Sequence, residues 1–333
     1  MERDRYDKRM RERSLERERE LARTKKILAL VIGLAIAAVI AVTLIISTGW
    51  PGSMRTARTE SETETEAATE PQEAITEALS DEEYAARARS LLDDTYDELE
   101  LTGSNGYVPS EELTEEAATL IAGMATEGFH CGFMILDIRT GKVAALNSQQ
   151  EFYAASASKA AYVVSLASRL DEISYQLESQ MKDITMYSSN KAYMNLKNTY
   201  GFETFDEWCA EAGVTDMHDT GGYAFYSAED LVRLWLKNYQ YFITAEDGEQ
   251  VAGWFETPET SAIATVLSEY VTQSKAGWYS STDLYYNSSV DAGIVYAGDY
   301  PYILAVVSDY PDNVTWLNGL VGFLDKVHEE MTA

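Results

Sequence analysis

The sequence predicts an α+β fold, in which a five-stranded antiparallel sheet is flanked by helices and carries an inserted helical subdomain. Apolar runs typical of β-strands occur at residues 131–138 and 143–146 and again at 292–297 and 302–308. Between them, apolar residues recur at helical spacing. Strands from both ends of the globular part must therefore meet in one sheet around a helical insertion.

The N-terminal residues predict a membrane anchor. Residues 1–26 form a charged segment that ends in Arg23, Lys25 and Lys26, whereas residues 27–47 contain no charged residue. At about 1.5 Å per residue, this apolar run is long enough to cross a hydrocarbon layer of roughly 30 Å. Because the basic residues precede it, we expect a single-pass protein of the cell membrane, with a cytoplasmic N-terminus and an extracytoplasmic globular domain.

A cleaved signal peptide is the alternative interpretation of residues 27–47. Its charged region would be unusually long, and no small-residue cleavage pattern follows closely, so a retained transmembrane helix is favoured. Residues 48–80 are rich in Thr, Glu, Ala and Ser. Such a composition buries too little apolar surface to offset the entropy lost on ordering, so we expect a disordered acidic stalk.

Charge and composition exclude several function classes. The chain has 333 residues and a formal net charge of −29, which disfavours nucleic acid as a partner because that binding requires basic side chains. His130, His218, His328, Cys131 and Cys209 are its only histidines and cysteines, and none has a metal-ligand spacing. We therefore expect neither a metal nor another cofactor, while pairing of the two cysteines stays open.

Residues 81–109 are expected to form an amphipathic helix and a connector, since their apolar residues fall on one helical face. A second helix is predicted after Pro109, with Ser110 as its N-cap and acidic residues in its first turn. The globular domain is therefore expected to span residues 110–333.

The first two predicted strands, residues 131–138 and 143–146, are joined by a turn that contains glycine. Ser156 follows them and begins an apolar helical pattern. Ser227 is predicted to cap a later helix, and the last helix carries apolar residues from Leu317 to Met331. Ser156 should therefore lie at the start of a helix, just after a hairpin.

Ser156 and Lys159 form the first candidate catalytic pair. A serine hydroxyl is a weak nucleophile until a base removes its proton, and a lysine one helical turn along projects from the same face. For Lys159 to be that base, its pKa of about 10.4 must fall through burial or a nearby cation. The same spacing recurs at Ser179 and at Ser188, so the hairpin and apolar helix around Ser156 distinguish it.

Two further short motifs follow in the chain. Ser188 and Asn190 lie in the segment Ser-Ser-Asn, and Lys275 and Gly277 lie in Lys-Ala-Gly-Trp, which ends at Trp278. Glycine there is expected to let a substrate approach the strand edge closely, and Lys275 supplies a positive charge. Each motif alone is more typical of an ordinary loop or strand, but the ordered set indicates a catalytic site.

Together these motifs make residues 110–330 resemble the class A β-lactamases and penicillin-binding proteins, whose marks are S-x-x-K, S-D-N and K-T-G. The resemblance implies a β-lactamase/transpeptidase-like fold. It also implies an acyl-enzyme mechanism on a small-molecule β-lactam or a D-Ala-D-Ala peptidoglycan stem peptide. No nucleic acid and no cofactor would take part.

The resemblance implies a role for each matching residue. Ser156 would attack the amide, Lys159 would activate Ser156, and Ser188 would pass a proton to the leaving nitrogen. Asn190 would hold the substrate's amide side chain, and Lys275 would attract its carboxylate. The backbone N–H groups of Ser156 and of Trp278, next to Gly277, would form the oxyanion hole.

Three departures from the family pattern bear on activity. Ser189 replaces the aspartate of S-D-N, and Ala276 replaces the hydroxyl residue of K-T-G, which removes a donor to the substrate carboxylate. Class A enzymes deacylate with a glutamate on a loop between the second and third motifs. Residues 215–226 contain no glutamate, although Asp219 is a candidate substitute.

Three functions therefore remain open. A serine hydrolase of the β-lactamase type is favoured. A D-Ala-D-Ala carboxypeptidase or transpeptidase would suit the anchor, the stalk and the missing glutamate. A non-catalytic wall-binding or β-lactam-sensing module would not need Lys159 and Lys275 together, so the presence of both lysines disfavours it.

Overall fold

The computed structural model describes residues 100–170, 173–214 and 223–333. Four predicted segments lie outside the described residues. They are the charged segment 1–26, the transmembrane helix 27–47, the stalk 48–80 and the helical part of 81–109. Within the described ranges, no helix combines the length and the apolar character that crossing a membrane requires.

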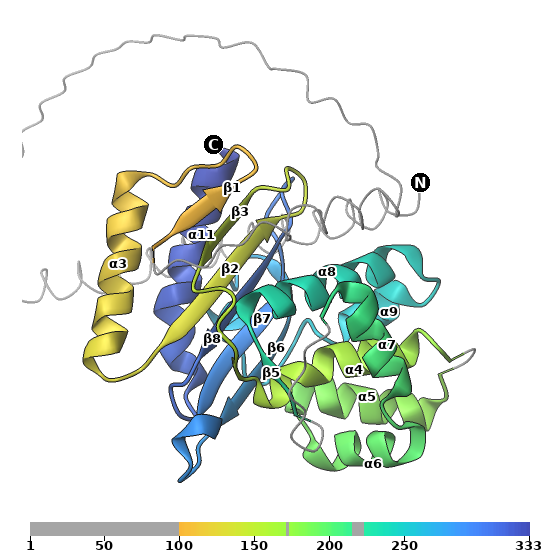
Figure 1. The fold of residues 1–333 in the computed structure, drawn as a ribbon. Coiled ribbons are helices and arrows are strands. Elements are labelled where there is room, and N and C mark those ends of the chain that lie inside the picture. Colours follow the sequence, from red (N-terminus) through yellow and green to blue (C-terminus); the bar gives the residue numbers. More distant parts are fainter. Residues whose placement is uncertain (1–99, 171–172, 215–222) are drawn as a thin grey trace, which may run out of the picture. The chain divides into compact units, whose positions relative to one another are not determined.

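One antiparallel sheet organises the described part of the chain (Figure 1). Its strand order is β1-β3-β2-β8-β7-β6. The α+β arrangement is as predicted, but the number of strands is not, because the sheet has six strands. They are β1 (Thr102–Ser104), β2 (Cys131–Asp137), β3 (Val143–Leu146), β6 (Val271–Tyr279), β7 (Ser288–Tyr296) and β8 (Tyr302–Ser308).

The additional strand is β1, which precedes residue 110. Thr102 pairs with Ala145 of β3, and its hydroxyl donates to the Ala145 carbonyl at 3.2 Å. Glu330 in the last helix accepts hydrogen bonds from the Tyr107 hydroxyl and the Ser110 N–H, both at 2.9 Å. The sequence Thr-Gly-Ser has no alternation of apolar and polar residues, so its periodicity does not predict a strand. The strand forms because β3 pairs with it and Glu330 holds the residues that follow it.

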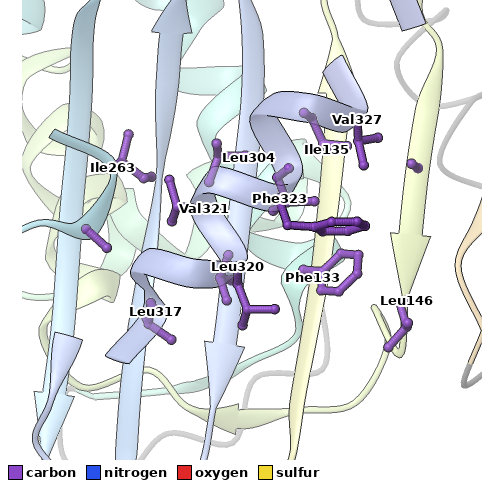
Figure 2. Packing of buried hydrophobic residues seen from close by; sticks show 14 of the residues in the cluster. Phe133, Ile135, Leu146, Ile263, Leu304, Leu317, Leu320, Val321, Phe323 and Val327 are labelled. Carbon is purple, nitrogen blue, oxygen red and sulfur yellow. The ribbon is translucent and has the colours of Figure 1, made fainter. Parts of the chain in front are cut away.

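Two helices cover one face of the sheet, α3 (Glu111–Thr126) and α11 (Asn318–Thr332). Figure 2 shows the core between α11 and the strands, where Phe323 lies against Phe133. Their ring centroids are 5.9 Å apart in an edge-on arrangement. Burying such side chains stabilises each by about 1.5–3 kcal/mol relative to exposure, and this packing fixes the sheet on which the site is built.

The other face carries α8 (Ala228–Thr244), which packs on β2, β7 and β8. Most of the helical insertion lies on the same side in Figure 1, but its last helix, α10 (Ala262–Val266), packs against α11 on the opposite face. Besides α8, the helices between the two halves of the sheet are α4 (Lys159–Ala167), α5 (Tyr175–Tyr187), α6 (Asn190–Tyr200), α7 (Glu203–Ala212), α9 (Gly248–Gly253) and α10 (Ala262–Val266). The short elements are β4 (Phe152–Tyr153), β5 (Phe225–Tyr226), η1 (Ala155–Ser158), η2 (Leu284–Tyr286) and η3 (Val314–Leu317).

Both predicted helix caps are present. Ser110 accepts from the Leu113 N–H at 3.3 Å. Ser227 and Asp230 form a reciprocal capping box at the start of α8, which satisfies donors that the first turn leaves unpaired. Cys131 and Cys209 are both buried and free, so the structure shows no disulfide between them.

Candidate active site

Ser156 lies on a tight turn between β4 and α4. The turn begins with Ala155 at φ 46°, a left-handed conformation that costs a residue with a Cβ about 1 kcal/mol or more. Ser156 follows in η1, half-buried, and Lys159 begins α4 with its side chain fully buried. The strained turn thus presents the serine at the helix start while the lysine points inward.

Gly277 on β6 packs directly against this turn. A Cβ at residue 277 would lie 2.1 Å from the Ala154 carbonyl oxygen, 2.6 Å from the Ala157 nitrogen and 2.8 Å from the Ser156 nitrogen. The sequence-based reason for this glycine, close approach of a substrate, is thus incomplete, because the backbone of the Ser156 turn itself needs the space. Gly277 thereby sets the distance between Ser156 and the strand.

The backbone of β6 supports the predicted oxyanion hole. β6 is the last strand in the sheet order, so one of its edges faces away from β7. The Ser274 N–H uses that outer edge, since it donates to the Phe255 carbonyl at 3.1 Å. Strand N–H groups alternate in direction, so the Trp278 N–H points outward as well, on the edge that the Ser156 turn approaches.

Ser188 lies at the junction of α5 and α6, where it adopts a left-handed conformation with φ 56°. Ser189 caps α6, because its hydroxyl accepts from the Ala192 N–H at 3.2 Å, and Asn190 is the first residue of α6. A serine in place of the family's aspartate therefore retains the cap, since both residue types are good N-caps.

Two buried lysines meet at Ser188. The Lys159 Nζ donates to the Ser188 carbonyl at 2.8 Å and to Asn190 Oδ1 at 2.6 Å. The Lys275 Nζ donates to the Ser188 hydroxyl at 3.1 Å and to the Ala276 carbonyl at 2.6 Å. Four of the predicted site residues are therefore joined by hydrogen bonds, namely Lys159, Ser188, Asn190 and Lys275. Ser156 lies one helical turn before Lys159, on the turn that packs against Gly277.

Burial shifts both lysines toward their neutral forms. It lowers the pKa of Lys159 from 10.5 to about 8. Burial, reinforced by the charge of Lys159, lowers the pKa of Lys275 to about 7, against the opposing attraction of Asp291. Burial also raises the pKa of Asp291 to about 6. A lysine that loses its proton near neutral pH meets the requirement for a general base.

Two tyrosines that sequence reasoning missed surround Lys159. Its Nζ lies 5.4 Å from the ring centroid of Tyr193 and 5.7 Å from that of Tyr223. The Tyr223 hydroxyl donates to Asn190 Oδ1 at 2.9 Å. Because Oδ1 accepts from both Tyr223 and Lys159, the amide N–H groups of Asn190 must face elsewhere. No motif spacing signals Tyr223, which reaches the site only through the β5 strand next to it.

Trp278 contributes its side chain to the opposite face of β6. The indole packs against the core between the sheet and α11, and the Lys275 Nζ lies 5.8 Å from its ring centroid. Asp219, the candidate substitute for the missing glutamate, lies outside the described residues. Among the described residues, no group of three or more His, Cys, Asp or Glu side chains has the arrangement of a metal site.

The sequence matches the model of the beta-lactamase enzyme family over residues 112–186 and 171–319. The fold is similar to that of a beta-lactamase from Chitinophaga pinensis, with a TM-score of 0.56 and 14% identity over 66% of this chain and all 100% of that one. A class A beta-lactamase from Mycobacterium abscessus gives a TM-score of 0.52 and 16% identity, covering 66% and 100% of the two chains. PBP-A gives 0.53 and 16%, covering 66% and 97%. No curated protein matches the sequence.

We expect Gly277→Ala to displace the Ser156 turn, because the new methyl group would overlap three of its backbone atoms. Overpacking of this kind costs about 1–3 kcal/mol. Denaturant unfolding should show that loss of stability. A serine-reactive fluorophosphonate should also label Ser156 at least ~10-fold more slowly, which corresponds to a loss of about 1.4 kcal/mol of transition-state contacts. The control is Gly319→Ala, where a Cβ meets no atom within 4 Å. Equal labelling of both variants would contradict the packing argument.

We expect Tyr223→Phe to slow labelling of Ser156 by roughly 2- to 10-fold, because one hydrogen bond of about 0.5–1.5 kcal/mol no longer orients Asn190. The measurement is the fluorophosphonate labelling rate, read by intact mass. Tyr241→Phe is the matched control, since it removes a hydroxyl of α8 that donates to Asp247 at 2.6 Å. A Tyr223→Phe rate equal to the control rate would rule out a positioning role.

Proposed function

This chain belongs to the beta-lactamase enzyme family, and on that premise we propose that it is a serine hydrolase which cleaves the amide of β-lactams or related acyl donors through an acyl-enzyme on Ser156. The observation that carries the proposal is the meeting of Lys159 and Lys275 at Ser188, beside the Ser156 turn. Burying two ammonium groups is costly unless they have partners, and a purely structural module gains nothing from it.

In the proposed acylation step, neutral Lys159 takes the proton of the Ser156 hydroxyl while the oxygen attacks the amide carbonyl carbon. The bond between that carbon and the amide nitrogen then breaks, and Ser188 delivers a proton to the leaving nitrogen. The hydrogen bond from the Lys275 Nζ to the Ser188 hydroxyl, 3.1 Å long, supports this transfer when the two coupled lysines share one proton. In the reactive form Lys159 is neutral and Lys275 is charged, so Lys275 can return a proton to Ser188.

The same geometry supports three substrate contacts. The Ser156 N–H and the outward-pointing Trp278 N–H would bind the developing oxyanion, each donor contributing about 3 kcal/mol. The amide N–H groups of Asn190, whose oxygen is occupied by Lys159 and Tyr223, would donate to the substrate's side-chain carbonyl. Lys275 would attract the substrate carboxylate. The additional hydrogen bond that a hydroxyl residue would donate is missing, because residue 276 is alanine.

A D-Ala-D-Ala carboxypeptidase or transpeptidase is the second candidate, and the absence of a glutamate from residues 215–226 favours it. Hydrolysis of an acyl-enzyme needs a base to activate water, and burial raises the pKa of Tyr223 above its usual 10.0. A phenol that keeps its proton donates to Asn190 and cannot act as that base. An acyl-enzyme that persists until a peptide amine or slow water attack releases it fits this arrangement.

The proposed setting is outside the cytoplasm, with residues 27–47 as the membrane anchor and residues 48–80 as the stalk. This part of the proposal rests on the apolar run and the basic residues that precede it. Placed there, the site would meet both β-lactams and peptidoglycan stem peptides.

The test is the intact mass of the protein after mixing with a chromogenic cephalosporin, with product colour followed in parallel. We expect a mass adduct that forms within the first turnover and disappears slowly, because acylation has its base in Lys159 while deacylation lacks a glutamate. The adduct and any colour should be absent in Ser156→Ala.

Each outcome separates the candidates. Fast colour release without a stable adduct would establish a β-lactamase with another deacylation base, for which Asp219→Asn is the next variant. A stable adduct that transfers to an added D-amino acid would establish the transpeptidase. Neither adduct nor colour in the wild-type protein would contradict the proposed acyl-enzyme.

A further inference from the structure

A buried carboxylate on β7 takes no part in the acylation step described above. Asp291 is fully buried, and it pairs with Ala276, whose side chain belongs to the core between the sheet and α11. Its Oδ2 accepts from the Ser261 hydroxyl at 2.7 Å and from the Ile263 N–H at 3.1 Å. Its Oδ1 has no hydrogen-bond partner among the described residues. The carboxylate is therefore held by neutral donors and only in part.

Two serines draw this carboxylate toward β6. The Ser261 and Ser274 hydroxyl oxygens are 2.8 Å apart, and the Ser261 hydroxyl oxygen also accepts from the Ala264 N–H at 3.0 Å. Because the single proton of the Ser261 hydroxyl goes to Asp291, Ser274 must donate to Ser261. The chain from Ser274 through Ser261 to Asp291 thus joins the carboxylate to the strand that carries Lys275.

Lys275 is the charged residue that faces Asp291 from the elements around it. Among the described elements packed against β7, strand β6 contains no other Asp, Glu, Lys or Arg, and β8, α10, η1 and η3 contain none. The charged residues of α8 lie on the opposite face of the sheet, and Glu259, before α10, is exposed to solvent. The other titratable residues of the three strands are Tyr279, Tyr296 and Tyr302.

The ammonium group of Lys275 approaches the face of the sheet that carries Asp291. Its Nζ donates to the carbonyl of Ala276, the partner of Asp291 across the two strands, at 2.6 Å. The ring of Trp278 lies on the same face as Asp291, because alternate residues of a strand share a face, and its centroid is 5.8 Å from that Nζ. Since both charges are buried, water and salt screen their attraction only weakly.

Asp291 acts on one of the two lysines. Burial and the charge of Lys159 lower the pKa of Lys275, and Asp291 opposes this fall, whereas burial alone lowers the pKa of Lys159. Lys275 still holds its proton less tightly, with a pKa of about 7 against about 8 for Lys159. The reactive form, in which Lys159 is neutral and Lys275 is charged, is therefore the less populated one, and it would be rarer without Asp291.

We propose that Asp291 is a positioning residue that favours Lys275 as the holder of the proton shared by the two lysines, so that Lys159 can activate Ser156. The inference rests on the proposed function and assigns the acid and base roles within it. No bond to the substrate forms or breaks at Asp291. Its negative charge favours transfer of one proton from the Lys159 ammonium to the Lys275 amine.

The variant Asp291→Asn should fold at least as stably as the wild-type protein near neutral pH. Burial raises the pKa of Asp291 from 3.8 to about 6, so the folded protein binds this proton more tightly than the unfolded chain does. The resulting stabilisation is complete below the unfolded pKa and is lost as the pH rises through the folded pKa. An amide has no charge to bury and keeps an oxygen that can accept from Ser261. Denaturant unfolding checks this stability.

The experiment compares acylation of the full-length wild-type protein and Asp291→Asn by benzylpenicillin, read by intact mass from about pH 5 to about pH 9. The maximal second-order rate constant should fall roughly 3- to 10-fold in the variant, because each unit lost from the pKa of Lys275 relative to Lys159 makes the reactive form tenfold rarer. The acidic limb of the profile should also move to lower pH, since the doubly protonated pair loses its first proton more readily. A merely structural role would lower the rate equally at every pH.

An NMR titration of lysines isotope-labelled at Cε follows the same proton without a substrate. In Asp291→Asn the pKa of Lys275 should fall by about one unit, while that of Lys159 should not fall. The control is Asp325→Asn, which removes a carboxylate of α11 that accepts from the Tyr302 hydroxyl at 2.8 Å. This control should change neither lysine and should keep the shape of the rate profile.

The outcomes separate this inference from the proposed function. Unchanged lysine titrations in Asp291→Asn, or a rate profile that keeps its position on the pH axis, would overturn the role of Asp291 and leave the acyl-enzyme intact. Failure of benzylpenicillin to acylate the wild-type protein would contradict the proposed function, and with it any role of Asp291 in activating Ser156. The titration would then still decide whether Asp291 favours the proton on Lys275.

Discussion

Two buried ammonium groups, those of Lys159 and Lys275, are held within hydrogen-bond distance of one residue, Ser188. Removing a charge from water costs several kcal/mol even after the protein relaxes, so the surrounding structure must supply acceptors. The Ser188 carbonyl and Asn190 Oδ1 serve Lys159, while the Ser188 hydroxyl and the Ala276 carbonyl serve Lys275. Incomplete compensation by these acceptors is what moves both lysines toward their neutral forms.

The fold supports this arrangement with strained backbone at two places. Ala155, before Ser156, and Ser188 both adopt left-handed conformations that residues with a Cβ rarely occupy. The sheet compensates for that cost, because β6 is fixed by its pairing with β7 and presents Gly277 to the Ser156 turn. The site thus joins three segments distant in sequence: the turn before α4, the junction of α5 and α6, and the edge strand β6. Their relative positions depend on the packing of α4 against α5, α7 and α8, and of α8 against the sheet.

The features of this arrangement that depend on neighbouring residues alone can be predicted from the sequence. The caps Ser110 and Ser227, the hairpin before Ser156 and the order of the three motifs are visible in residue types and spacing. β1 is not, because Thr-Gly-Ser carries no apolar alternation and is held by β3 and Glu330. Tyr223 is likewise invisible, since only tertiary packing brings it to Lys159.

Gly277 was predicted correctly as a site residue, but the reason given, close approach of a substrate, was incomplete. Its place in a motif indicated the strand, but only the three-dimensional contact reveals that the Ser156 turn occupies the space a side chain would need.

The most direct test of this account is an NMR titration of lysine side chains isotope-labelled at Cε, with Lys159→Met and Lys275→Met to assign the two resonances. We expect these lysines to lose their protons near pH 8 and pH 7, respectively, while exposed lysines titrate near about 10.4. Lys159 would then be charged in mildly acidic solution and become a base as the pH rises through its pKa. Titration of both groups above about 10, as in unperturbed lysines, would contradict the account, because the neutral fraction of Lys159 at neutral pH would then be more than ~100-fold lower than a pKa of about 8 provides.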